Sequence, residues 1–398
     1  MPNTSNALRR NLPKLSALSA MTAFGFSMPI IILFQQAHGL TLTQALLLQS
    51  FYSLALVICE IPSGYLADRW GRKPTIVTGA FLLSAGMLIY ALSSGFIGFL
   101  IAEIILAIGG SCQSGTIEAL TYDTLTALKE EKRFLKVNGL QGFCVLGGKT
   151  ITSLLAGSLA AVSIILPLWV DVGLFGLAIP LSLTLQEPLR QVMKETQHLK
   201  AIWNVCTHAL IRNKILQGLL LIATIVAVID LQIFWFLQPY QEAAGLPLPL
   251  FGLTYAAMCL AGAIAYKEAH RFGQRAESMH TLIIIAIVLI LACIGMGAVT
   301  SLWGLSFFIM EGIAFGLFDP IISNLINHAT TSDVRATVLS LKSLAARLLF
   351  AASSPLLAFS ADKFSLSYAF FLTAIFGFTA LVIIYVTTGK GITRATAQ

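Results

Sequence analysis

A Gly-Gly-Lys-Thr run in the stretch FCVLGGKTIT (143–152) has the residue types of a phosphate-binding loop. Such a loop needs a further glycine five residues before its final Gly-Lys-Thr triplet, and it lies between a strand and a helix. The position in question is Phe143, and Gly142 is one residue too early. The run also lies inside a long apolar segment. Spacing and context therefore exclude a nucleotide loop, and Lys149 is instead a cation placed within an apolar segment.

Acidic residues in other apolar segments are the next candidates for chemistry, because charges at bilayer depth usually serve a function. Glu103 and Glu311 each lie about two helical turns inside a segment, and Asp230 lies in the outer half of another. A carboxyl group removed from water favours its neutral form and can carry a proton across a membrane. These three residues are therefore candidates for binding a proton. The alternative is that a neighbouring helix permanently satisfies each carboxyl.

The composition shows which elements must position these residues. Of the 398 residues, 57% are hydrophobic and 11% are charged, whereas a soluble domain carries roughly a quarter charged residues. Apolar runs of about 20 residues recur, which is the length that crosses a bilayer. We predict an all-α membrane protein with twelve transmembrane helices, at 13–36, 43–66, 74–94, 96–122, 136–160, 164–186, 214–239, 248–267, 279–299, 302–326, 337–360 and 365–388.

Several function classes lack the residues that they need. The six cysteines are scattered singly, without the paired spacing of a metal site or a disulfide framework, and the six histidines are equally dispersed. No catalytic constellation accompanies them. We expect no enzyme activity, no metal and no cofactor. The net charge of +7 does not predict a nucleic-acid partner, because basic residues also set membrane topology.

The basic residues assign a side to each loop. With twelve spans, 22 of the 25 Lys and Arg residues lie on the side of both termini, and Lys363 lies on the other. The positive-inside rule makes the first side cytoplasmic. The N-terminus has a basic flank without a cleavage site and is read as an uncleaved first helix. The longest polar stretch divides the chain into an N-terminal half (1–186), a cytoplasmic linker (187–213) and a C-terminal half (214–398).

The two halves contain a weak internal repeat. A shift of 202 residues lays ADRWGRK (67–73) over AHRFGQR (269–275), and it lays Arg133 over Arg335. The chain therefore reads as two six-helix halves in parallel orientation. In transporters with such repeats, the substrate site lies near the membrane midplane between the halves.

Lys149 and Arg347 form a related pair under this shift. Arg347 corresponds to position 145, one helical turn from Lys149 and on the same helix face. If both cations face inward, they suit an anionic or polycarboxylate substrate. In the other interpretation, each cation pairs with a nearby acid such as Glu103, Asp230 or Glu311. The charges then cancel, and no net positive charge faces a substrate. The sequence leaves both readings open.

The stretch EIPSGYLADRWGRKP (60–74) joins the second span to the third. Its glycines allow a tight reversal of the chain, and its basic residues suit the anionic cytoplasmic leaflet. The stretch resembles the signature loop of the major facilitator superfamily, G-x-L-A-D-r-x-G-r-k. The matching residues are Gly64, Leu66, Ala67, Asp68, Arg69, Gly71, Arg72 and Lys73.

The resemblance implies a latch and a cavity. In that family the loop is similar to a latch of the outward-open state, with Asp68 facing the start of helix 11 and Arg72 pairing with Asp123 at the cytoplasmic end of helix 4. Helices 1, 4, 7 and 10 line the cavity in such proteins, which favours Glu103, Asp230 and Glu311. Asp171 is less favoured, because helix 6 is peripheral there.

The function expected from this resemblance is proton-coupled export of a small organic solute by alternating access. Substrate-binding candidates are Lys149, Arg347, Gln113, Trp235 and Asn324. Helix 4 lacks the family's usual mid-helix arginine and helix 5 lacks the antiporter Gly-Pro pair, which favours a narrower exporter over the multidrug branch. A siderophore or other carboxylated metabolite would suit the two cations, and a drug-like solute is the conventional expectation. The alternative is uptake by proton symport. We expect a monomer in the inner membrane of a bacterium, with small molecules, protons and lipid as its partners.

Overall fold

In the computed structural model, the described residues are 2–23, 25–188, 214–276, 279–330 and 335–395. All regular structure within these ranges is helical, without a strand. Eleven helical segments of the described chain are long and apolar enough to cross a membrane. The predicted linker, 187–213, lies outside the described residues except for its first two positions. The chain divides into two compact units, each of which is described separately below.

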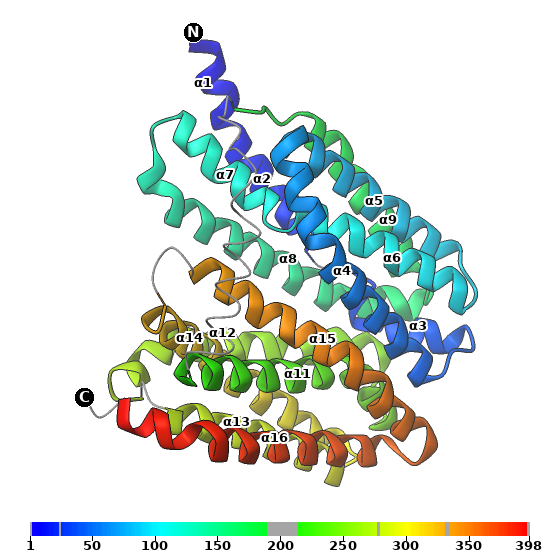
Figure 1. The fold of residues 1–398 in the computed structure, drawn as a ribbon. Helices are drawn as coiled ribbons and strands as arrows, with labels where there is room; N and C mark the ends of the chain where they lie inside the picture. Colours follow the sequence, from blue (N-terminus) through cyan, green and yellow to red (C-terminus); the bar gives the residue numbers. More distant parts are fainter. Residues whose placement is uncertain (1, 24, 189–213, 277–278, 331–334, 396–398) are drawn as a thin grey trace. The chain divides into compact units, whose positions relative to one another are not determined.

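The first unit runs from the N-terminus through α9, apart from residues 41–46, and also includes residues 247–253. Figure 1 shows its helices in blue to green. They are α1 (Pro2–Arg9), α2 (Asn11–Thr22), η1 (Met28–Ile30), α3 (Ile31–Ala37), α4 (Leu42–Trp70), α5 (Arg72–Leu92), α6 (Phe96–Gln113), α7 (Thr116–Ala127), η2 (Glu131–Arg133), α8 (Phe134–Val162) and α9 (Leu166–Leu183).

The predicted first span, 13–36, is divided among α2, η1 and α3. Two residues give the physical reason. Gly25 favours a non-helical backbone, since glycine pays the largest entropy cost in a helix. Pro29 removes a backbone donor but is tolerated at the start of the next helical piece. The segment Met28–Ala37 is consequently only a short apolar helix.

The core of the first unit lies where α2, α5, α7 and α9 meet. Apolar side chains of these helices and of the turn after α9 are buried together there: Leu15, Leu18, Ile76, Ala80, Leu120, Ala178 and Leu185. Helix α5 packs against both α6 and α9. Helix α8, which contains the Gly-Gly-Lys-Thr run, packs on α2, where a Cβ at Gly148 would lie 3.1 Å from the Ala20 carbonyl oxygen.

The second unit contains residues 41–46, α11 and the chain from residue 254 onward. Its helices are α11 (Lys214–Ala243), α12 (Phe251–Ala276, whose first residues belong to the first unit), α13 (Met279–Ala298), η5 (Leu302–Gly304), α14 (Leu305–His328), α15 (Arg335–Lys363) and α16 (Leu366–Ala395), and η4 (Leu248–Leu250) precedes α12. Helix α16 packs on α11, α13 and α15.

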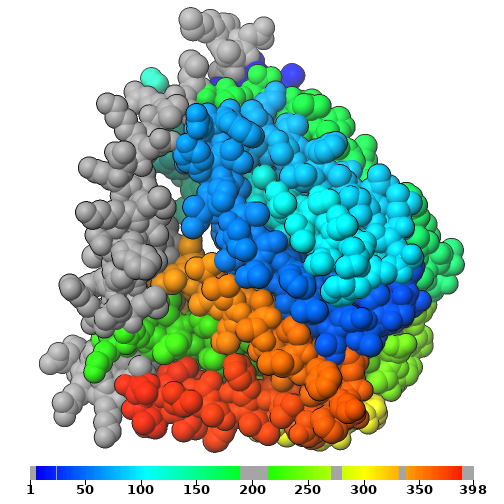
Figure 2. All heavy atoms as spheres, turned by 45° about the vertical axis from the view of Figure 1, so that its right-hand side comes forward, coloured from blue at the N-terminus to red at the C-terminus, as the bar shows by residue number. Residues whose placement is uncertain are grey.

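Both units carry apolar side chains on their outer faces, as a lipid environment requires. Figure 2 shows one face of each unit, with α4 to α6 in blue to cyan and α15 and α16 in orange to red. Large exposed apolar side chains on these helices include Ile61, Phe81, Ile97, Phe359 and Phe378. Contiguous exposed apolar surface of this kind marks a membrane contact rather than a solvated surface.

Candidate functional site

The signature loop is a one-residue turn between two helices. Helix α4 ends at Trp70 and α5 begins at Arg72, and the intervening Gly71 has a φ of 119°. Only glycine adopts this backbone region without strain. The Arg72 guanidinium lies 2.9 Å from an Asp68 carboxylate oxygen and 3.4 Å from Asp123 Oδ2. The structure thus brings Arg72 and Asp123 together, as the resemblance implied.

Glu187 contacts this loop, and the sequence did not predict the contact. Its two carboxylate oxygens accept the backbone N–H groups of Arg72 at 2.8 Å and Lys73 at 2.6 Å. These amides open α5 and have no partner within the helix. A negative charge there also interacts favourably with the helix dipole. The contact spans 114 residues of sequence, and no local signal marked it.

Asn11 closes a ring of hydrogen bonds behind the loop. Its fully buried amide group donates to the Gln186 carbonyl at 2.8 Å and accepts the Gln186 N–H at 3.0 Å. It also donates to Thr124 Oγ1 at 3.3 Å. Gln186 precedes Glu187 and Thr124 follows Asp123. The ring therefore runs through the start of α2, the last turn of α7, the residues after α9 and the start of α5. The loop is therefore held by contacts that involve α2, α7 and the residues after α9.

We expect Glu187→Gln to lower the free energy of unfolding by about 0.3–1 kcal/mol, because the start of α5 loses its negative charge. Thermal unfolding of the purified protein in detergent measures the change. Glu60→Gln, at an exposed glutamate inside α4 and away from a helix start, serves as the control. An equal loss in both variants would contradict the capping role.

Glu103 is buried in a polar network of the first unit. Its Oε1 accepts a hydrogen bond from Gln49 Nε2 at 2.8 Å, and the Tyr90 hydroxyl also bonds its side chain. Gln35 bonds Tyr90 in turn. Glu103 itself is 5% exposed. The network joins α3, α4, α5 and α6 through uncharged partners, so the described neighbours of Glu103 include no cation.

Two breaks in the helices of the first unit lie next to each other. Helix α6 ends at Gln113 and α7 begins at Thr116, with Gly115 at a φ of 71°. The last residue of α2, Thr22, bonds Gln113 Oε1 through its hydroxyl at 2.6 Å. Gln113 is 6% exposed, and its Nε2 has no partner among the described residues. Discontinuous membrane helices often form binding sites in transporters.

Asp230 and Glu311 form a carboxyl pair in the second unit. A side-chain hydrogen bond joins Asp230 of α11 to Glu311 of α14. Glu311 is buried and Asp230 is half-buried. Two carboxyl groups in a hydrogen bond must hold a proton between them, because two carboxylates only repel. The remaining oxygen of Glu311, Oε1, is buried without a described partner. This pair can therefore store one proton away from water.

Close packing of two helices positions Glu311. A Cβ at Gly312 would lie 2.6 Å from the Met258 carbonyl oxygen, and one at Gly316 would lie 2.3 Å from the Gly262 carbonyl oxygen. Backbones of α12 and α14 thus touch, as small residues permit in membranes. Tyr255 and Cys259 of α12 are electrostatic neighbours of Glu311. The acid pair therefore lies among α11, α12 and α14.

The predicted substrate-contacting residues differ in their burial and in their neighbours. Lys149 on α8 and Arg347 on α15 are half-buried. None of the described hydrogen bonds of Glu103, Asp230 or Glu311 goes to either cation. Trp235 is 7% exposed and packs edge-on against Phe234 with ring centroids 4.9 Å apart. Asn324 on α14 is half-buried.

A second ion pair lies in the second unit. Lys342 Nζ of α15 is 3.0 Å from Asp319 Oδ1 of α14. Lys342 is among the basic residues of the predicted cytoplasmic side. The contact ties the two helices together there, but both side chains remain partly exposed.

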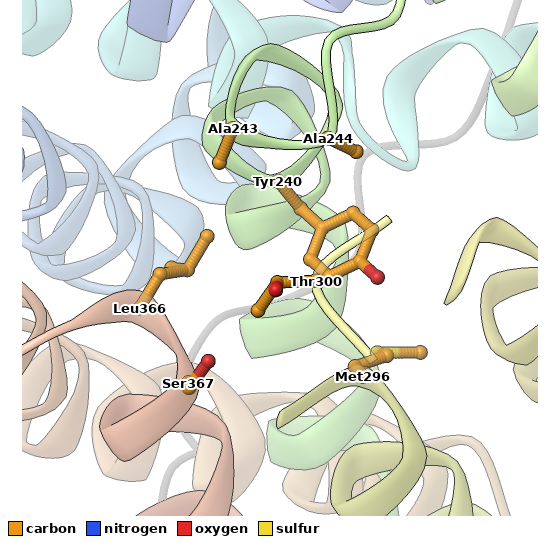
Figure 3. A pocket seen from close by; sticks show the side chains of 7 residues that line it. All are labelled: Tyr240, Ala243, Ala244, Met296, Thr300, Leu366 and Ser367. Atoms are coloured by element: carbon orange, nitrogen blue, oxygen red, sulfur yellow. The ribbon is translucent and has the colours of Figure 1, made fainter. Parts of the chain in front are cut away.

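A small pocket in the second unit lies away from these residues. It has a volume of about 30 Å³ and is lined by Tyr240, Ala243, Ala244, Met296, Thr300, Leu366 and Ser367 (Figure 3). Such a space has room for only a few water molecules, which is too small for an organic solute. The Tyr240 hydroxyl donates to the backbone carbonyls of Val299 and Ser301. Its role here is to hold the loop before η5.

Comparison with known proteins gives a consistent result. A family model described as Major Facilitator Superfamily matches residues 15–341. An MFS-type transporter of Methanocaldococcus jannaschii is 23% identical over 280 residues, which are 70% of this chain and 71% of that protein. The inner membrane transport protein YajR of Escherichia coli is 36% identical over 91 residues, or 23% of this chain and 19% of that protein.

Solved structures share the fold at low sequence identity. The nucleoside transporter NupG has a TM-score of 0.77 at 12% identity, with 96% of this chain and 98% of that chain covered. A bacterial homolog of the human lysosomal transporter Spinster, inward-facing and unoccupied, has a TM-score of 0.77 at 16% identity, with 96% and 97% covered. Identities this low show the shared fold alone.

Proposed function

Because this chain belongs to the major facilitator superfamily, and is therefore a multi-pass membrane transport protein and not an enzyme, we propose that it exports a small organic solute in exchange for protons. The solute crosses by alternating access between two six-helix halves with twelve spans in total. The protein acts as a monomer in a bacterial inner membrane, with both termini cytoplasmic. The excess of basic residues on one predicted side supports this orientation.

The carboxyl pair Asp230–Glu311 carries the proposal. A secondary transporter driven by protons needs a group that binds a proton in a dry site and releases it when the site opens to water. The pair holds a proton between two carboxyl groups, and no cation is among the described partners of either group. Glu103 supplies a further buried carboxyl in the first unit. Symport uptake would use the same groups, so the direction of transport is a separate question for experiment.

The solute site in this proposal combines the two half-buried cations with polar and aromatic contacts. Lys149 and Arg347 attract the carboxylates of an anionic, siderophore-like solute. Gln113, Trp235 and Asn324 add hydrogen bonds and an apolar wall. The loop residues Gly64, Asp68, Arg69, Gly71, Arg72 and Asp123 serve as the latch of one conformation, and their fixed partners support that role.

Transport in liposomes tests the function directly. Purified protein is reconstituted, a pH gradient is imposed, and a panel that includes citrate, a hydroxamate chelator and a cationic dye is added. A pH-sensitive dye inside the vesicles reports proton movement coupled to each solute. We expect proton movement that requires both the protein and an anionic solute. Solute flux that is independent of the gradient would contradict proton coupling, and proton movement in the opposite sense would establish symport.

Replacing either cation tests the charge assignment. We expect Lys149→Gln and Arg347→Gln each to reduce transport of the anionic solute about tenfold or more, since hydrogen bonds to charged groups contribute about 1.5–3 kcal/mol. Transport of an uncharged or cationic solute should not fall. Lys363→Gln, at an exposed cation, is the matched control. Undiminished anion transport in both variants would reject the anionic site.

A further inference from the structure

Five residues separate the two pieces of the first predicted span, between Thr22 at the end of α2 and Met28 at the start of η1. The backbone N–H groups at such a break have no helical partner. In a membrane interior each unpaired group costs several kcal/mol, so a break persists only where other groups accept its hydrogen bonds. The acceptor identifies what holds the break in place.

Asp171 of α9 supplies both acceptors. Its Oδ1 accepts the Phe26 N–H at 2.7 Å, and its Oδ2 accepts the Ser27 N–H at 2.8 Å. The side chain is 0% exposed. Two amides that donate to two different oxygens suit a carboxylate, because a protonated carboxyl has a hydroxyl oxygen that accepts poorly. The amide donors compensate the charge directly.

Gly25 makes room for this contact. A Cβ at position 25 would lie 2.4 Å from Asp171 Oδ2 and 2.8 Å from its carboxyl carbon. Any other residue at this position must push the Asp171 carboxyl or the backbone aside. The break thus needs a small residue on one helix and an acid on the other, and the chain has both.

The break sets the position of the end of α2. Thr22 is the last residue of α2, and its hydroxyl bonds Gln113, whose Nε2 is buried without a described partner. We propose that Asp171 is a positioning residue, which fixes the broken first span so that Thr22 orients the Gln113 amide toward the transported solute. This proposal rests on the proposed function for the solute contact of Gln113. Its first part, from Asp171 to Gln113, does not depend on the identity of the solute.

Two readouts that need no solute test the first part. Hydrogen exchange of the amides at 25–30 reports whether the break keeps its acceptors. The rate of cross-linking between Cys residues in a Thr22→Cys, Gln113→Cys variant, made in a background without the native cysteines, reports how close the end of α2 lies to position 113. We expect Asp171→Asn to speed exchange about tenfold and to slow cross-linking severalfold, with cross-linking slowed even where thermal stability is kept.

Gly25→Ala provides a second variant that leaves Asp171 in place but displaces its carboxyl. We expect it to have the same two effects, and we expect the double variant to be no worse than the worse single one, because both changes remove one contact. Gly173→Ala on α9, where a Cβ meets nothing within 4 Å, is the control. Unchanged exchange and cross-linking in both single variants would overturn the proposal.

Gln113→Ala distinguishes the positioning of Gln113 by Asp171 from the contact of Gln113 with the solute. This variant should leave exchange at 25–30 unchanged and should weaken binding of the transported panel solute, seen as a raised KM. If Gln113→Ala transports every solute normally while Asp171→Asn alters exchange and cross-linking, then the solute contact fails and the positioning of Gln113 by Asp171 stands. If Asp171→Asn has no effect on either readout, the positioning fails whatever Gln113 does.

Discussion

Asp230→Asn and Glu311→Gln are each expected to reduce accumulation of solute driven by a pH gradient at least about tenfold. An amide is neutral like the protonated acid but cannot release a proton, so the transporter keeps one protonation state throughout its cycle. Exchange of labelled for unlabelled solute, which needs no net proton movement, should continue. Both measurements use the same proteoliposomes, with and without the imposed gradient.

Glu242→Gln is the matched control, because Glu242 lies on α11 with Asp230 but is exposed. Its accumulation and exchange should equal those of the unchanged protein. Loss of exchange together with accumulation in the Asp230 and Glu311 variants would point to a structural role for the pair. Retention of both activities would remove the pair from proton coupling and leave Glu103 as the remaining candidate.

Gly316→Ala is expected to lower the stability of the protein. The added Cβ would lie 2.3 Å from the Gly262 carbonyl oxygen, where neither backbone can yield without separating α12 from α14. Overpacking of this kind costs about 1–3 kcal/mol. Because Glu311 lies on the same helix, the separation should also disturb the carboxyl pair. Thermal unfolding in detergent measures the first effect, and gradient-driven accumulation measures the second.

The control for this substitution is the same change where space is open. Gly173→Ala should be neutral or stabilising, by up to about 1 kcal/mol, because alanine favours a helix over glycine. The opposite signs of the two substitutions would show that the Gly316 effect comes from helix contact. If the two variants unfold at the same temperature, the close approach of α12 and α14 does not contribute to stability.

Two features of the signature loop were predictable from the sequence, and a third was not. Its glycine spacing predicted a tight turn, and Gly71 adopts the positive φ that such a turn needs. The match also indicated Asp123 as the partner of Arg72, and the two lie together. The acceptor for the start of α5 was missed, since Glu187 lies 114 residues from Lys73. A sequence without an alignment carries no signal for a contact at that separation.

Asp171 is a residue whose structural role the sequence did not predict. The family resemblance made it a weak candidate, because the resemblance implies that helix 6 is peripheral. In the structure its carboxylate supports a break in another helix, and Gly25 and Pro29 were the local signs of that break. Both residues are common in membrane helices, so they could not by themselves distinguish a continuous span from a broken one. The acceptor that stabilises the break belongs to α9.

Composition and apolar periodicity by themselves determined that this protein is helical and crosses a membrane, because the bilayer allows few other arrangements. A contiguous motif likewise determined the family resemblance. Only the tertiary structure decided which buried charges meet. Asp230 and Glu311 are 81 positions apart along the chain, and the backbone contact of α12 with α14 helps to place one of them. The pairing of buried carboxyls follows from helix packing, which periodicity does not encode.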